Sequence, residues 1–124
     1  MIYGIGIDLI EIERIKQAIE RNGQRFIDRV YTETEQAYCS GRPSFACYAA
    51  RFTAKEAFLK ALGTGLRKGM KWRDIEVETD ELGKPYLRLY GYLQERCHAE
   101  GFAHLHLTLS HSSAYAVAQV VIER

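Results

Sequence analysis

The sequence predicts a mixed α+β fold, and two features of its hydrophobic pattern favour that class. Segments with the alternation of β-strands occur as neighbouring pairs joined by short turns, which is typical of antiparallel hairpins. A series of helical patterns, the longest over residues 45–62, separates the first strand from those pairs. Because repeated strand–helix–strand units are missing, a parallel α/β sheet is not expected.

The chain begins with a strand that leads into helices. Residues 2–12 alternate Ile5, Ile7 and Leu9 with smaller or polar residues and are rich in β-branched side chains. A helical period starts at residue 13, and the Asn-Gly pair at 22–23 ends that helix. Apolar residues within 26–30 predict another short helical turn.

A capping box and a long apolar pattern define the next two helices. Thr32 and Glu35 have the spacing of a capping box that opens a helix towards Cys39. Residues 40–44 contain Gly and Pro and predict a loop. The segment 45–62 repeats large apolar residues at helical spacing, and the glycine at 63 ends it.

The last third of the chain predicts two hairpins around one helix. Alternating residues and the turn signal at 80–85 indicate the first hairpin, and the Ser-Ser pair at 112–113 joins the second. The expected elements are strands 74–79 and 86–90, a helix over 92–100, and strands 104–109 and 115–122.

Length and charge limit the function classes. With 124 residues the chain suits one domain, expected over 1–124. Its 17 basic and 16 acidic side chains nearly cancel, which disfavours a domain that binds nucleic acid mainly through charge. No signal peptide and no apolar run near ~20 residues are evident, so a cytoplasmic location is expected. Cys39, Cys47 and Cys97 are odd in number and lack metal-site spacing, which favours reduced thiols.

Two acidic residues interrupt apolar patterns. Glu56 lies within the predicted apolar stripe of helix 45–62, where a charge is costly unless it is paired or binds a metal. A helix-face ion pair with Lys60 is the simpler explanation. Asp8 interrupts the apolar pattern of the first strand. The simple explanations are a carboxylate at the end of a strand or a residue that caps a helix. Alternatively, Asp8 and Glu56 share a Mg²⁺ ion completed by water and phosphate oxygens.

A serine and a histidine adjoin at the end of the strand before the last turn. Ser110 and His111 cannot form a nucleophile–base pair, because neighbours in a strand point to opposite faces. A phosphate contact and a simple surface turn are both compatible with this position. The glycines at 63 and 65 precede three basic residues, which suits a phosphate, although a helix C-cap alone explains Gly63.

The segment 14–29 carries five basic and two acidic residues. Arg14, Arg21 and Arg25 would share one helical face if the helix continued beyond Gly23. A solvated face explains this pattern, and so does a docking surface for an acidic partner.

Four motifs in this order resemble the short 4′-phosphopantetheinyl transferases, the holo-[acyl-carrier-protein] synthases. The resemblance extends from Ile2 almost to Arg124. The motifs are Gly4-Ile5-Gly6-Ile7-Asp8 with Glu11 and Arg14, Arg51-Phe52-x-x-Lys55-Glu56-Ala57-x-x-Lys60-Ala61-x-Gly63-x-Gly65, Gly83-Lys84-Pro85, and Leu109-Ser110-His111-Ser112-x-x-Tyr115-Ala116.

The resemblance implies an antiparallel sheet packed on a long central helix, in a homotrimer with active sites between subunits. It implies transfer of the 4′-phosphopantetheine arm of coenzyme A to a serine of apo acyl carrier protein, for fatty acid biosynthesis, with release of adenosine 3′,5′-bisphosphate. The implied roles are Mg²⁺ ligands (Asp8, Glu56), catalysis (Glu56, Lys60, His111), coenzyme A binding (Arg51, Lys60, Gly63, Gly65, Lys84, Pro85, Ser110, His111) and carrier docking (Arg14, Arg21, Arg25).

Several points stay open at this level. The base that accepts the serine proton is not identified. The candidates are Glu56, a water bound to the metal and a carboxylate of the carrier. Thr53 replaces an alanine that is frequent in the family, and little effect of this change is expected. A module that binds coenzyme A without consuming it, or one that binds nucleic acid through the 14–29 segment, would explain parts of the pattern.

Overall fold

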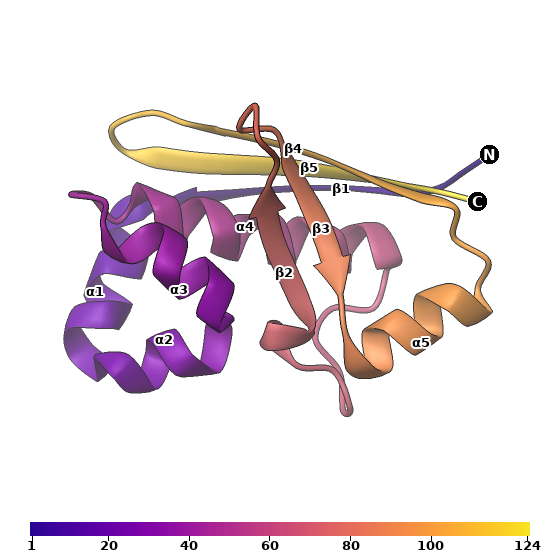
Figure 1. The fold of residues 1–124 in the computed structure, drawn as a ribbon, viewed down its shortest axis with the longest axis horizontal. Helices are drawn as coiled ribbons and strands as arrows, with labels where there is room; N and C mark the ends of the chain where they lie inside the picture. Colours follow the sequence, from indigo (N-terminus) through magenta and orange to yellow (C-terminus); the bar gives the residue numbers. More distant parts are fainter.

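One helix organises the structure, a computed structural model that describes residues 1–124. Helix α4 (Ala46–Leu62) lies along one face of an antiparallel sheet, and the opposite face of that sheet is left uncovered (Figure 1). The strands follow the order β1 (Ile2–Glu11), β5 (Tyr115–Glu123) and β4 (His104–His111) across the sheet. The α+β class and the packing of an antiparallel sheet on the long helix are confirmed.

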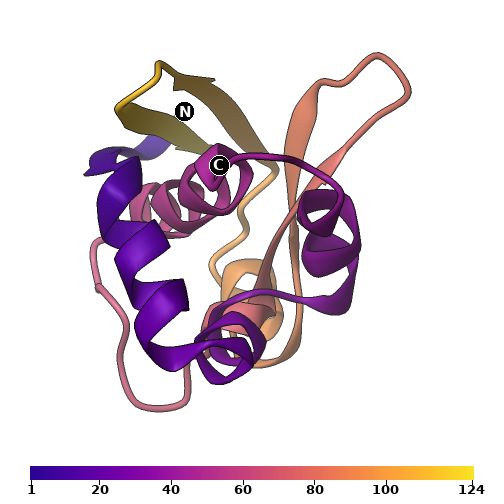
Figure 2. The same ribbon diagram turned by 90° about the vertical axis from the view of Figure 1, so that its left-hand side faces the viewer.

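The other elements surround α4 on its remaining sides. Three short helices gather at its N-terminal end, and a separate hairpin packs beside it against β4 (Figure 2). None of the helices is long and apolar enough to cross a lipid bilayer. The elements are α1 (Ile12–Asn22), α2 (Gln24–Val30), α3 (Glu33–Ser40), the 3₁₀ turn η1 (Trp72–Asp74), β2 (Ile75–Thr79), β3 (Pro85–Leu89) and α5 (Gly91–Ala99).

The main core lies between α4 and the inner face of the sheet. On β5, Ala118, Val120 and Ile122 alternate with outward residues and are at most 1% exposed. They pack with Ala57 and Phe58 of α4, both fully buried. Burial of these side chains supplies most of the driving force that holds the sheet on the helix.

Strand β1 approaches α4 unusually closely because its inner face carries glycine. A Cβ atom on Gly4 would lie 1.9 Å from the carbonyl oxygen of Ala61, and one on Gly6 would lie 2.0 Å from that of Ala57. No other residue fits between the strand and the helix backbone. The next inward position on β1 is Asp8, so this close approach brings the Asp8 carboxylate to α4.

A fully buried lysine connects four segments of the fold. Lys55 of α4 forms an ion pair with Glu35 of α3, with 2.7 Å between Nζ and Oε1, and both side chains are 0% exposed. Its ammonium group also donates to the carbonyl oxygens of Val30 and Ile75. Burial lowers the pKa of Lys55, and Glu35 opposes that shift. The neighbouring residue on α4 is Glu56, so this network fixes the rotation of the helix that carries it.

The predicted elements are confirmed, with ends that differ by one or two residues. Thr32 and Glu35 form the predicted capping box: the Thr32 hydroxyl accepts from the Glu35 backbone and the Glu35 carboxylate accepts from that of Thr32. The helix does not continue past Gly23, whose φ of 60° separates α1 from α2. The predicted end of the helix at Asn22-Gly23 is confirmed, so the condition for a single helical face of Arg14, Arg21 and Arg25 is not met.

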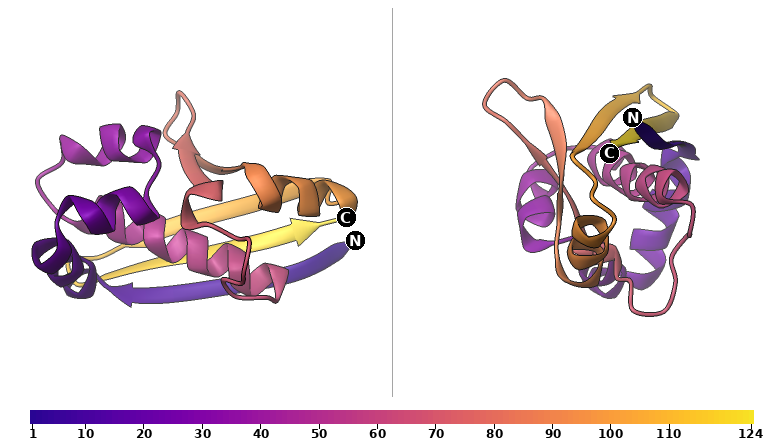
Figure 3. Two further views of the ribbon diagram at one scale, coloured as in Figure 1. Left: turned by 90° about the horizontal axis from the view of Figure 1, so that it is seen from below. Right: turned by 90° about the vertical axis from the view of Figure 1, so that its right-hand side faces the viewer.

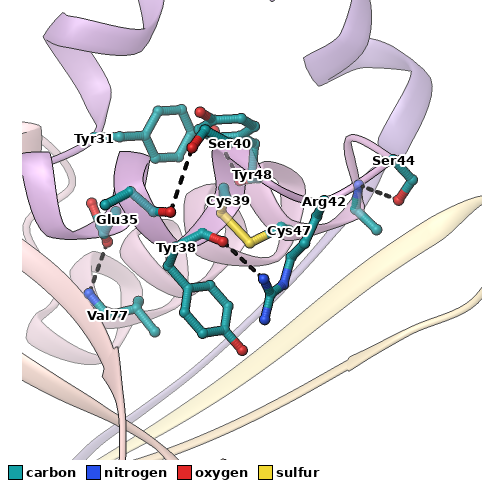
Figure 4. Close-up of a disulfide and its surroundings, with 12 residues drawn as sticks. Tyr31, Glu35, Tyr38, Cys39, Ser40, Arg42, Ser44, Cys47, Tyr48 and Val77 are labelled. Atoms are coloured by element: carbon teal, nitrogen blue, oxygen red, sulfur yellow. Dashed lines mark hydrogen bonds between the residues drawn. A yellow bond between two sulfur atoms is a disulfide. The ribbon is translucent and has the colours of Figure 1, made fainter.

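The expectation of reduced thiols is wrong for two of the three cysteines. Cys39 at the end of α3 and Cys47 in the first turn of α4 form a disulfide, with their Cα atoms 5.5 Å apart (Figure 4). Only Cys97 is free, and it is buried. The two bonded cysteines meet because the loop after α3 reverses the chain, which the spacing of eight residues did not reveal.

Candidate functional site

Three side chains contact one another where β1 crosses α4, and a fourth lies on the helix between two of them. The Lys60 ammonium lies 2.9 Å from Oδ1 of Asp8 and 3.1 Å from the carbonyl oxygen of Ile7. The hydroxyl of Thr53 donates to the other Asp8 oxygen. Glu56 lies between Thr53 and Lys60 along the helix, one turn from each. We refer to Asp8, Thr53, Glu56 and Lys60 as the acid cluster.

The charge of Asp8 acts on Glu56. Burial raises the pKa of Glu56, the negative charge of Asp8 raises it further, and Lys60 opposes both. The predicted helix-face ion pair is wrong, because Lys60 pairs with Asp8 and Glu56 has no ion-pair partner. Asp8 and Glu56, with Lys60 paired to Asp8, have the charge to bind a divalent metal ion.

Glu56 does not lie in a buried stripe, contrary to the sequence-based expectation. Helix α4 is buried on most sides, and its least buried positions are Tyr48, Phe52, Glu56 and Lys60, each four residues from the next. The error arose because a helix covered by a sheet, a hairpin and other helices is apolar nearly all round. Glu56 thus faces the least buried side of α4.

The helix-cap explanation for Asp8 is wrong as well. The N-cap of α1 is Glu11, and no side chain caps that helix. Asp8 lies three residues before the end of β1 and is partly buried against α4. Its contacts with Thr53 and Lys60 leave it in the acid cluster rather than at a terminus.

A cavity of about 380 Å³ opens near the N-terminal half of α4. It brings together four of the predicted coenzyme A residues, namely Arg51 of α4, Pro85 at the start of β3, and Ser110 and His111 at the end of β4. Its further lining comes from Tyr38, Arg42, Pro43, Ser44, Ala46, Cys47, Ala50, Thr79, Gly83 and Leu109. Segments far apart in the sequence therefore converge on one concave surface.

Arg51 is a buried cation without a counter-ion. It is 4% exposed, and its Nε has no hydrogen-bond partner. Burial lowers the pKa of Arg51 and the adjacent Arg42 adds to that decrease, whereas Glu35 and Tyr38 oppose it. No carboxylate lies within ion-pair distance of either arginine. An uncompensated positive charge in a cavity wall suits an anionic ligand.

Other predicted residues lie outside this cavity. Gly63 and Gly65 follow the end of α4 with φ values of 88° and 64°. At 1.5 Å per residue, Gly63 is roughly 18 Å along the helix from Arg51. Lys84 is exposed in the β2–β3 turn, between two residues that line the cavity. Lys60 belongs to the acid cluster.

The basic residues of the docking prediction lie on two helices. Arg14 and Arg21 are exposed on α1 and Arg25 is exposed on α2. None of them forms an ion pair within the chain. Their charges are thus available to an acidic partner, although they do not form one continuous helical stripe.

Sequence reasoning missed Tyr38 and Arg42, and it expected little effect from Thr53, whose hydroxyl donates to Asp8. Thr53 was available as a signal, because it lies one helical turn before Glu56 and carries a hydroxyl in an otherwise alanine-rich helix. Tyr38 and Arg42 gave no such signal. They reach the cavity only because the loop after α3 folds back along α4.

Comparisons with known proteins identify the family. Residues 4–120 match the model of the 4′-phosphopantetheinyl transferase superfamily. The chain belongs to this superfamily. Among relatives of this transferase chain, a holo-[acyl-carrier-protein] synthase of Trichlorobacter lovleyi is 49% identical, over 99% of this chain and 98% of the relative.

Solved transferase structures have the same fold. A holo-[acyl-carrier-protein] synthase from Neisseria meningitidis superposes with a TM-score of 0.93 at 35% identity, with both chains fully covered. One from Bacillus anthracis, in complex with CoA (3′,5′-ADP), gives a TM-score of 0.83 at 40% identity, over 99% of this chain and 97% of that one. The fold predicted from the family resemblance is therefore confirmed.

Proposed function

We propose that the chain is a holo-[acyl-carrier-protein] synthase that uses Mg²⁺. It transfers the 4′-phosphopantetheine arm of coenzyme A to a serine hydroxyl of apo acyl carrier protein, in support of fatty acid biosynthesis. Membership of the transferase family supports this activity. The observation that carries it is the acid cluster, in which Asp8 and Glu56 of two separate family motifs are close enough for the charge of Asp8 to raise the pKa of Glu56.

Asp8 and Glu56 are the proposed Mg²⁺ ligands. The donor set fits this ion, since hard carboxylate oxygens are supplied while water and phosphate oxygens complete its coordination. No group of three or more potential metal-binding side chains occurs in the chain, so water and phosphate oxygens would supply the remaining ligands. When bound, Mg²⁺ would neutralise negative charge on the pyrophosphate oxygens. Lys60 holds the Asp8 carboxylate in place through its 2.9 Å contact.

The cationic side chains bind and orient the phosphates. Arg51 offers a buried guanidinium with a free Nε, and His111 is exposed at the cavity rim. Lys60 donates to the oxygens that gain charge as the pyrophosphate breaks. The remaining proposed contacts to coenzyme A are those of Gly63, Gly65, Lys84, Pro85 and Ser110.

The reaction is an attack on phosphorus. The serine oxygen of the carrier bonds to the β-phosphorus of coenzyme A, and the bond from that phosphorus to the bridging oxygen breaks. Adenosine 3′,5′-bisphosphate leaves with the bridging oxygen, and the serine proton passes to a base. Glu56 is the candidate acceptor within this chain, because it is the carboxylate of the acid cluster that no ion pair engages. A carrier carboxylate and a water of the metal site are the alternatives.

A homotrimer with sites between subunits is proposed for the assembly. The outer face of the sheet supports it, because Ile5, Ile7 and Leu9 are 57–62% exposed there in the single chain. Val121 and Val117 pair with Ile5 and Leu9 and extend the same apolar face. A face of this kind usually marks a protein interface. We expect Ile7→Glu to lower the solution mass from trimer to monomer; a wild-type monomer would contradict the assembly.

The trimer would also explain the separation of the predicted ligands. Gly63 and Gly65 lie at the opposite end of α4 from the cavity, too far for both groups to surround one phosphate within a single chain. A neighbouring chain would bring one group to the other. The single domain over 1–124 and the cytoplasmic location stay predictions.

Mass spectrometry of the carrier tests the activity. Incubation with apo carrier protein, coenzyme A and Mg²⁺ is expected to add one phosphopantetheine group to the carrier. Glu56→Gln should slow this step at least about 100-fold, the scale of losing a catalytic group. Glu95→Gln is the matched control, since Glu95 is exposed on α5 without an ion pair. Coenzyme A that binds without being consumed, across a panel of carriers, would reject the activity.

Charge reversal tests the docking face. Arg21→Glu and Arg25→Glu are expected to raise the KM for the carrier, more at low than at high salt, because exposed charges are screened. The KM for coenzyme A serves as the internal control and should not change. An unaltered carrier KM at low ionic strength would remove Arg21 and Arg25 from the docking surface.

A further inference from the structure

Two arginines of the cavity wall share one aromatic ring. The guanidinium carbon of Arg42 lies 3.8 Å from the ring centroid of Tyr38, and that of Arg51 lies 4.3 Å from it. Arg42 also donates from Nη1 to the backbone carbonyl oxygen of Tyr38 at 3.0 Å. Figure 4 shows the Tyr38 ring beside the Arg42 guanidinium, next to the disulfide.

The ring is the main partner that these cations have. The nearest relevant acid, Glu35, is committed to Lys55 at 2.7 Å. Two adjacent guanidinium groups repel each other, so without a partner they would swing apart towards solvent. The face of an aromatic ring attracts cations through its quadrupole.

A ring and a carboxylate would have different consequences for a ligand. A carboxylate would neutralise the arginines and occupy their N–H donors. A ring holds each guanidinium by its flat face and does not occupy the N–H groups at its edge, of which Arg42 commits only Nη1 to the Tyr38 carbonyl oxygen. The buried Arg51 Nε has no hydrogen-bond partner, as expected of a donor kept available. The cavity therefore keeps two charged donor sets for one anion.

The backbone that carries the ring is fixed covalently. Tyr38 precedes Cys39, whose partner Cys47 lies one helical turn before Arg51 on α4. The disulfide thus connects the segment with the ring to the segment with the buried cation. Arg42 lies inside the loop that this bond closes. The covalent bond thus keeps the ring close to the cations before a ligand binds. This reduces the entropy cost of ordering these side chains on binding.

We propose that Tyr38 is a positioning residue that holds the guanidinium groups of Arg42 and Arg51 against its ring, at the cavity wall, for the phosphates of the nucleotide substrate. This role rests on the proposed function for the identity of the nucleotide, coenzyme A. Tyr38 touches the arginines and acts on the phosphate through them.

Two substitutions distinguish the role of the Tyr38 ring from that of its hydroxyl group. Tyr38→Leu removes the aromatic face but keeps an apolar residue with a high helix propensity in α3. Tyr38→Phe keeps the face. We expect Tyr38→Leu to weaken binding of adenosine 3′,5′-bisphosphate and to raise the KM for coenzyme A roughly fivefold to thirtyfold. The kcat and the KM for the carrier should change little, and Tyr38→Phe should retain wild-type binding.

Control variants exclude a general effect on the fold. Tyr92→Leu, on α5 and away from the cavity lining, should bind the bisphosphate as the wild type does. In an Arg42→Gln background, Tyr38→Leu should have a smaller effect than in the wild type, because one of the cations that it positions is gone. The positioning role would be overturned if the losses of bisphosphate affinity in Tyr38→Leu and Arg42→Gln were fully additive. Equal losses of affinity in Tyr38→Leu and Tyr38→Phe would overturn it as well.

Direct binding keeps this role distinct from the proposed function. Titration calorimetry with adenosine 3′,5′-bisphosphate measures the nucleotide site whether or not transfer occurs. Wild-type transfer together with unchanged binding by Tyr38→Leu would overturn the role of Tyr38 and leave the activity standing. Bisphosphate binding that depends on the ring, without transfer to any carrier, would support the role of Tyr38 and reject the activity.

Discussion

Replacing Gly6 by alanine should separate β1 from α4 and weaken the acid cluster. The added methyl group would lie 2.0 Å from the carbonyl oxygen of Ala57 and 2.6 Å from the backbone nitrogen of Ala61. The shorter distance falls about 1.4 Å below the 3.4 Å at which ordinary contact begins. Both obstacles are helix backbone that cannot rotate away, so the strand or the helix must move as a unit.

The displacement has two measurable consequences. Overpacking of this kind costs about 1–3 kcal/mol of unfolding free energy. For a chain of this length that corresponds to a Tm lower by roughly 4–12 °C. Asp8 and Glu56 lie on the two elements that move apart, and a shift near 1 Å in a catalytic group lowers rates by about 100-fold. Activity should therefore fall much further than stability.

The assay follows Tm and phosphopantetheine transfer as a function of Mg²⁺, at one protein concentration because assembly contributes to Tm. Gly41→Ala is the matched control: its φ is −85° and a Cβ there meets nothing within 4 Å. This variant should keep the wild-type Tm and activity. If Gly6→Ala unfolds at the wild-type temperature and transfers at the wild-type rate, the close approach of β1 does not position Asp8.

Further predictions concern the disulfide, the acid cluster and the free thiol. Replacing Cys39 and Cys47 by serine should lower the unfolding free energy by about 2.5 kcal/mol, from the closure entropy of an eight-residue loop, and a urea titration showing no loss would contradict this. Burial and Asp8 raise the folded-state pKa of Glu56, so its stabilising contribution is present below about pH 4.5 and lost as the pH rises through the raised value. Glu56→Gln should therefore raise the Tm of the metal-free protein at pH 7 while transfer is lost; a lower Tm would refute the pKa assignment. Burial raises the pKa of Cys97 to about 11, so a thiol reagent at pH 8 should label the native protein slowly and label one thiol per chain on unfolding in the absence of reductant. Rapid labelling of the native chain would show that Cys97 is accessible.

Sequence patterns revealed the features that depend on neighbours along the chain. The capping box at Thr32 and Glu35 was evident because its two members lie within one helical turn. Asp8 and Glu56 attracted attention because each places a charge in an apolar pattern. Their meeting in space followed only from the family resemblance, and the electrostatic contact between them agrees with it.

Features that depend on long-range packing were predicted incorrectly or missed. The exposed side of α4 could not be identified, because a helix covered on most sides has no clear apolar stripe. The Cys39–Cys47 bond and the contacts of Tyr38 require the reversal of the chain after α3, which is set by tertiary structure. An i to i+8 spacing and a tyrosine in a short helix do not encode that geometry.

The two ends of the chain meet at one corner of the sheet (Figure 3). The Met1 amino group donates to the carbonyl oxygen of Arg124 at 3.1 Å, and the Arg124 amide donates to that of Met1 at 2.8 Å. His111 lies at the opposite end of β4, where the strand turns towards β5. A short peptide could thus join the termini and allow the chain to be opened elsewhere, for example in the exposed turn after Thr79. A circularly permuted transferase of this kind would retain every strand pairing of the three-stranded sheet.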